Sequence, residues 1–109
     1  MPSKAFNVAY VEIGLLEKAP EQAEMLKLYG LAKIAQGEDI STKSAPGMFN
    51  FVAKEKYNAW KKLADEGISA ADADKQYVEL VNEYKTKYGI KPEDKLTAEE
   101  KEKLAKAKA

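Results

Sequence analysis

Residues 44–60 read SAPGMFNFVAKEKYNAW. The Pro46–Gly47 pair predicts a turn, and a cluster of large apolar residues follows it directly at Met48, Phe49 and Phe51. A lysine-rich helical stretch then leads to the single tryptophan of the chain. This pattern predicts a long loop that docks on a helical body and sets lysine ammonium groups beside aromatic rings. It also suggests part of a site for a ligand that is both anionic and apolar.

Helical patterns surround this stretch on both sides, because apolar residues recur there at the three- to four-residue spacing of a buried helix face. The predicted helices cover residues 3–17, 20–36, 50–64 and 69–88. Ser3, Asn50 and Ser69 are suitable N-caps, whereas Gly37 and Gly89 are suitable residues for helix ends. The loop between the second and third helices is long enough for these two helices to run parallel. The expected fold is therefore an all-α, four-helix bundle.

The C-terminal segment, residues 91–109, differs in character from the rest of the chain. Leu96 and Leu104 are nearly its only large apolar residues, and Thr97 with Glu100 has the pattern of a capping box. We expect a charged tail that is a short helix or disordered and that adds little to the core. The predicted division is a helical domain over residues 3–90, followed by this tail.

Composition excludes several kinds of function. The net charge is zero, with 18 basic and 18 acidic residues, so no excess of positive charge favours nucleic-acid binding. All the basic residues are lysines, and the chain has no cysteine and no histidine. Thiol nucleophiles, imidazole bases and the usual zinc ligands are therefore missing, and we expect no catalytic residue, no metal and no cofactor. No signal peptide or membrane-spanning run is apparent, so the expected location is cytoplasmic.

Several short motifs occur in an order and at a spacing that resemble the acyl-CoA-binding protein family. They are EMLKLYGLAKIA at 24–35, GEDI at 37–40, PGM at 46–48, KEKYNAW at 54–60 and YV at 77–78. Each motif is weak alone, but together they are specific, and the resemblance covers roughly residues 5–90. It implies an up-down-down-up bundle that binds, sequesters and transports long-chain fatty acyl-CoA esters without any chemical step.

The resemblance also implies roles for individual residues. Tyr29, Lys33 and Lys56 match the family positions that hold the ribose 3′-phosphate and the adenine end of the ligand, and Tyr77 matches an aromatic residue that packs against the nucleotide. Met25 and its neighbours match the groove near the acyl chain. Ala32 stands where an aromatic residue is typical. The candidate ligand-binding residues are therefore Met25, Tyr29, Ala32, Lys33, Lys56 and Tyr77.

Other interpretations stay open beside this one. Without the resemblance, Lys33 and Lys56 would be read as solvated surface lysines, and Tyr77 as part of a core stripe. The chain could be a helical protein-interaction module without a ligand, which docks through the apolar cluster or the tail. An acyl-CoA enzyme is disfavoured, because no paired carboxylates stand out. For a carrier we expect a monomer that makes transient contacts with acyl-CoA-using enzymes or membranes.

Overall fold

The computed structural model describes residues 2–47 and 49–109, and its regular structure in this part of the chain is helical apart from one isolated bridge. The long helices are α1 (Lys4–Glu12), α2 (Gln22–Ala35), α3 (Phe51–Asp65), α4 (Ala70–Tyr88) and α5 (Ala98–Lys108). Single 3₁₀ turns lie at Ile13–Leu15, Ile40–Thr42 and Glu93–Lys95. The prediction of an all-α fold is confirmed. Met48, a member of the predicted apolar cluster, lies outside the described residues.

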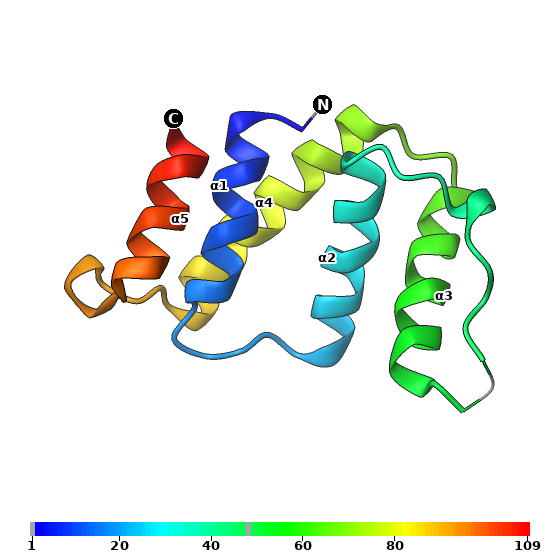
Figure 1. The fold of residues 1–109 in the computed structure, drawn as a ribbon, viewed down its shortest axis with the longest axis horizontal. Coiled ribbons are helices and arrows are strands. Elements are labelled where there is room, and N and C mark those ends of the chain that lie inside the picture. The colour runs from blue at the N-terminus through cyan, green and yellow to red at the C-terminus, as the bar shows by residue number, and fades with distance from the viewer. Residues whose placement is uncertain (1, 48) are drawn as a thin grey trace.

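The first four helices form the predicted up-down-down-up arrangement. In Figure 1, α1 and α4 run downwards, whereas α2 and α3 both run upwards. This is possible because the chain between α2 and α3 returns along the length of α3 before that helix starts. The second helix packs against both α3 and α4, and α1 packs against α4.

The core lies where α1, α2 and α4 meet. Phe6 of α1, Leu31 of α2 and Val81 of α4 are its largest fully buried side chains. Trp60 extends the same cluster from α3. Residue size controls how closely the helices approach, because a Cβ atom built on Gly30 would lie 2.8 Å from Cδ1 of Leu63 on α3. The small residue on α2 thus permits the close contact with α3.

Local cap chemistry sets the ends of most helices, as predicted. The side chains of Ser3, Asn50 and Ser69 accept hydrogen bonds from the backbone N–H groups three residues later, at the starts of α1, α3 and α4. Gly37 follows α2 and Gly89 follows α4, and both have φ angles of 78°. This left-handed region favours glycine and stops the helix.

Two helix ends differ from the prediction. The second helix begins after Glu21 instead of at Pro20, because Glu21 and Glu24 form a reciprocal capping box there. The first helix ends at Glu12 and continues only as the 3₁₀ turn at Ile13–Leu15.

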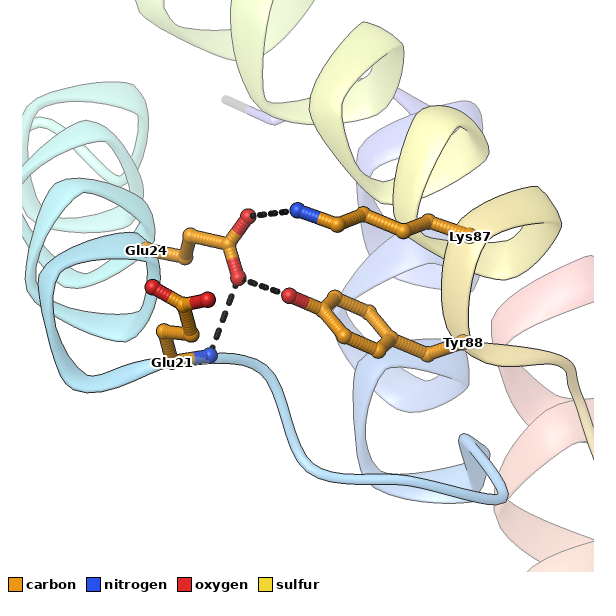
Figure 2. A network of polar contacts seen from close by, with 4 residues as sticks. All are labelled: Glu21, Glu24, Lys87 and Tyr88. Atoms are coloured by element: carbon orange, nitrogen blue, oxygen red, sulfur yellow. Dashed lines mark hydrogen bonds and ion pairs between the residues drawn. The ribbon is translucent and has the colours of Figure 1, made fainter.

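A polar network joins the start of α2 to the end of α4 (Figure 2). The Glu24 carboxylate accepts hydrogen bonds from the Tyr88 hydroxyl and, at 2.9 Å, from the backbone N–H of Glu21. Its other oxygen pairs with the Lys87 ammonium at 3.1 Å. The Tyr88 hydroxyl contributes most to holding the pKa of Glu24 below its ordinary value, followed by the Glu21 N–H. This side chain therefore favours its charged form in the folded protein.

The C-terminal segment, residues 91–109, packs against the bundle, but Leu96 is its one buried hydrophobic residue and no residue of α5 is buried. The segment contains α5, which packs against α1 and runs in the opposite direction (Figure 1). The Thr97–Glu100 capping box is present, and Leu96 is only 8% exposed. An antiparallel bridge between Leu16 and Ile90 fixes where this segment leaves the bundle. A division of the chain after residue 90 stays a prediction.

The described residues contain no helix whose length and hydropathy would suit a bilayer-spanning segment.

Candidate functional site

A hollow of about 430 Å³ lies among α1, α2, α3 and α4. Its lining includes all six predicted ligand-binding residues, which are Met25, Tyr29, Ala32, Lys33, Lys56 and Tyr77. The structure thus brings together residues from three helices that are far apart in sequence. Their role in binding a ligand stays a prediction.

The α2 wall of the hollow follows from helical spacing. Met25, Tyr29, Ala32 and Lys33 stand at i, i+4, i+7 and i+8, so they share one face of the helix. The face changes from apolar at Met25, which is 45% exposed, to charged at Lys33 about two turns later. One helix therefore provides both an apolar and a cationic part of the site.

Two lysines flank the ring of Tyr29. The Lys33 Nζ atom lies 5.5 Å from the centre of this ring, and the Lys56 Nζ atom lies 5.6 Å from it. Lys33 also lies 5.8 Å from the ring of Trp60. These are cation–π distances, so the aromatic rings help to hold two ammonium groups near each other in spite of their like charge.

The two lysines differ in their present partners. Lys33 donates a hydrogen bond of 2.9 Å to Glu38, and this contact is the main reason why the pKa of Lys33 is raised. Among the described residues, Lys56 has no acidic partner within ion-pair distance. An anionic ligand would therefore meet an unpaired ammonium at Lys56 and would compete with Glu38 for Lys33.

A neighbouring hollow of about 270 Å³ shares Tyr29, Lys33 and Lys56 with the first. It adds Lys43 from the α2–α3 connection and Tyr57 from α3. The sequence analysis missed both residues, because neither belongs to a helical face together with the predicted residues. Three lysines and two tyrosine rings thus border one continuous depression, and such a site suits a ligand with several negative charges.

The opposite wall of the larger hollow is aromatic and apolar. The Tyr77 ring is only 2% exposed and lies 4.7 Å from the ring of Phe6 and 6.2 Å from the ring of Tyr10. Burial raises the pKa of the Tyr77 hydroxyl, which therefore stays neutral at physiological pH. Tyr77 thus belongs to the core and also borders the hollow. The partly buried Ile13 and the exposed Gly14 line the hollow as well.

Phe49 and Phe51, the two described members of the apolar cluster after the Pro46–Gly47 turn, do not dock the loop as expected. Phe49 is 86% exposed and Phe51 is 70% exposed. The inward contacts of this region come instead from Pro46, which borders the smaller hollow, and from the buried Trp60. The sequence pattern did not reveal that the Phe49 ring before α3 and the Phe51 ring in its first turn are exposed to solvent.

The titratable groups of the described residues form no cluster that could hold a metal ion. The groups that border the two hollows include lysine ammonium groups, tyrosine phenols, the Glu38 carboxylate, the Gln36 amide and apolar side chains.

Comparisons with known proteins agree with the geometry of the site. A family model described as "Acyl CoA binding protein" matches residues 3–81. The chain is 39% identical over 85 residues to Acyl-CoA-binding protein homolog 1 of Caenorhabditis elegans, which covers 78% of this chain and 95% of that protein. It is 36% identical over 88 residues to the Acyl-CoA-binding protein of Saccharomyces cerevisiae, which covers 81% of this chain and 98% of that protein. Acyl-CoA-binding protein 2 of Saccharomyces pastorianus matches with the same identity and coverage. Residues 82–109, including α5, lie beyond the match to the family model.

Proposed function

Because the chain belongs to the acyl-CoA-binding protein family, we propose that it binds long-chain fatty acyl-CoA esters and carries them without catalysing a reaction. Sequestration in the hollow would keep the apolar chain of the ester out of water. We further propose that the protein acts as a cytoplasmic monomer. It would pass its ligand to acyl-CoA-using enzymes or membranes through transient contacts.

The observation that carries this proposal is a pair of adjoining hollows that share Tyr29, Lys33 and Lys56, one of them bordered by several cations and the other more apolar. Lys33, Lys43 and Lys56 border the more cationic hollow. Met25 and Ala32 border the more apolar one. An acyl-CoA ester has the same two characters, since a nucleotide with several phosphates is joined to an alkyl chain. Burial of that chain contributes up to about 0.8 kcal/mol per methylene.

The proposed roles follow from these positions. Lys33, Lys56 and the Tyr29 hydroxyl would hold the ribose 3′-phosphate, because two ammonium groups flank one phenol ring. Tyr77 would contact the nucleotide from the opposite wall. Met25 would contact the acyl chain, and the small side chain of Ala32 would leave room in the floor of the hollow.

The phosphate contact is tested by comparing palmitoyl-CoA with its dephospho analogue, which lacks the 3′-phosphate. In isothermal titration, Lys33→Ala should weaken binding of palmitoyl-CoA by about 1.5–3 kcal/mol, because a partly buried, charge-assisted hydrogen bond is lost. Lys56→Ala should cost about 0.5–1.5 kcal/mol, because this side chain is exposed. Neither change should alter binding of the dephospho ligand appreciably.

Lys54→Ala is a matched control, since Lys54 is exposed on α3 and borders neither hollow. It should leave both affinities unchanged. Equal losses for both ligands in the Lys33 and Lys56 variants would contradict the phosphate role. Recovery of intact ester after long incubation would support a carrier, whereas release of free CoA would indicate an enzyme.

A further inference from the structure

A separate hollow of about 420 Å³ lies between α1 and α5. Its lining combines residues of α1 and of the 3₁₀ turn that follows it with two charged side chains of α5. These residues are Tyr10, Val11, Gly14, Leu15, Glu100 and Lys103. The hollow exists only because α5 lies against α1, and α5 lies beyond the match to the family model.

This hollow adjoins the candidate ligand site. Tyr10 of α1 and Gly14 of the 3₁₀ turn that follows it line both hollows. A Cβ atom on Gly14 would find no other heavy atom within 4 Å, and this position therefore leaves an open gap. The Tyr10 ring is 52% exposed and contacts the ring of Tyr77. The gap thus opens at the wall where the nucleotide is proposed to lie, not at the apolar end near Met25.

One acidic and one basic side chain border this hollow, and they differ in how firmly they are engaged. Lys103 pairs with Glu99 at 3.6 Å, and both side chains are well exposed. Such a pair contributes little and is easily exchanged for a stronger partner. Glu100 is already engaged, because its carboxylate accepts the Thr97 N–H at 2.9 Å and lies 4.0 Å from the Lys91 ammonium. The ammonium of Lys103 is therefore the charge that remains available, on a flexible four-carbon stem.

We propose that Lys103 is a further ligand-binding residue, which pairs with a phosphate group of the nucleotide part of the ligand across the gap at Gly14. The inference rests on the proposed function, because it needs an acyl-CoA ester in the neighbouring hollow. It assigns to α5 a direct part in binding the head group. The stem of Lys103 would lie over Tyr10 and Val11, and its ammonium would meet the anion.

The test compares Lys103→Gln with Lys101→Gln in the full chain. Both changes remove one positive charge from α5, but Lys101 is exposed and borders neither hollow. In isothermal titration at low ionic strength, Lys103→Gln should weaken palmitoyl-CoA binding about threefold to tenfold. It should weaken octanoyl-CoA by the same factor, because the lost contact is with the head group. Added salt should reduce the loss, and Lys101→Gln should change either affinity less than twofold.

A second measurement tests the path across the gap. Gly14→Leu fills the gap, so in this background Lys103→Gln should cause no additional loss. Fully additive losses would show that Lys103 acts only through the general field of the protein and would overturn the proposal. Equal losses in the Lys103 and Lys101 variants would overturn it as well. A loss confined to palmitoyl-CoA would overturn it too, by showing that the hollow holds the acyl end. If the unmodified protein bound neither ester, this result would contradict the proposed function itself.

Discussion

Two glycines illustrate opposite uses of a missing side chain. Gly30 is buried at the crossing of α2 and α3, where a Cβ atom would lie 3.1 Å from the backbone oxygen of Ala59 as well as 2.8 Å from Leu63. Gly14 lies at the rim of the ligand site with open space above it. The first glycine lets two helices approach, whereas the second leaves room for a ligand.

The change Gly30→Ala should destabilise the protein. Overpacking costs about 1–3 kcal/mol, and the better helix propensity of alanine offsets up to about 1 kcal/mol of this. We expect a net loss of about 1–2 kcal/mol in the free energy of unfolding, measured by urea denaturation. Gly14→Ala is the control and should be neutral or slightly stabilising. An unchanged free energy for Gly30→Ala would mean that α2 and α3 can separate without cost.

At the scale of elements, the network around Glu24 connects helix ends that are distant in sequence. Hydrogen bonds from Tyr88 and Glu21 and the ion pair with Lys87 all favour the carboxylate (Figure 2). The pKa of Glu24 is therefore lower in the folded than in the unfolded chain. By linkage, this group contributes stability above its unfolded pKa and loses that contribution as the pH falls through its folded pKa.

The change Glu24→Gln should consequently alter how stability depends on pH. The parent should be more stable than the variant at neutral pH, and the difference should stay constant down to about pH 5. Below that, the difference should close as the parent carboxylate becomes protonated. Chemical denaturation across a pH series measures this, with Glu79→Gln as an exposed control on α4. A difference that persists undiminished to about pH 3 would show that packing, not ionisation, accounts for it.

At the scale of the whole molecule, α5 makes the bundle larger than its four predicted helices. The buried Leu15, in the 3₁₀ turn that follows α1, lines the hollow beside α5, and Leu96 is buried before that helix begins. The backbone N–H of Lys91 donates to the carbonyl of Leu15 at 2.9 Å, so the chain is held to this turn before it reaches α5. The C-terminal segment is therefore integrated with the bundle.

A chain that ends at Pro92 keeps the Lys91 contact but lacks Leu96 and α5. It should still fold, because the contacts among α1 to α4 remain, but its thermal midpoint should fall. Burial of one leucine contributes about 1.5–3 kcal/mol, and each kcal/mol corresponds to about 4–8 °C in a domain of this size. Differential scanning calorimetry measures the shift. A chain that ends at Lys106 should melt close to the parent, and equal midpoints for all three chains would show that α5 adds no stability.

The sequence by itself determined most local features of this protein, since they depend on residues within one or two turns of each other. The caps at Ser3, Asn50 and Ser69 were predictable because a side-chain oxygen needs only a backbone N–H three residues away. The shared face of Tyr29 and Lys33 was predictable from helical spacing. Gathering Lys56 and Tyr77 into the same hollow needed the family resemblance, because no spacing rule joins separate helices.

Only the tertiary structure decided how distant surfaces meet. Lys43 borders a ligand hollow because of the path of the connection between α2 and α3, which no local pattern encodes. The pairing of Lys33 with Glu38 likewise depends on how the chain turns after α2. The sparse apolar residues of the C-terminal segment suggested a tail, yet α5 packs against α1. Whether a weakly amphipathic segment packs depends on the surface it finds, and that surface exists only once the other helices are assembled.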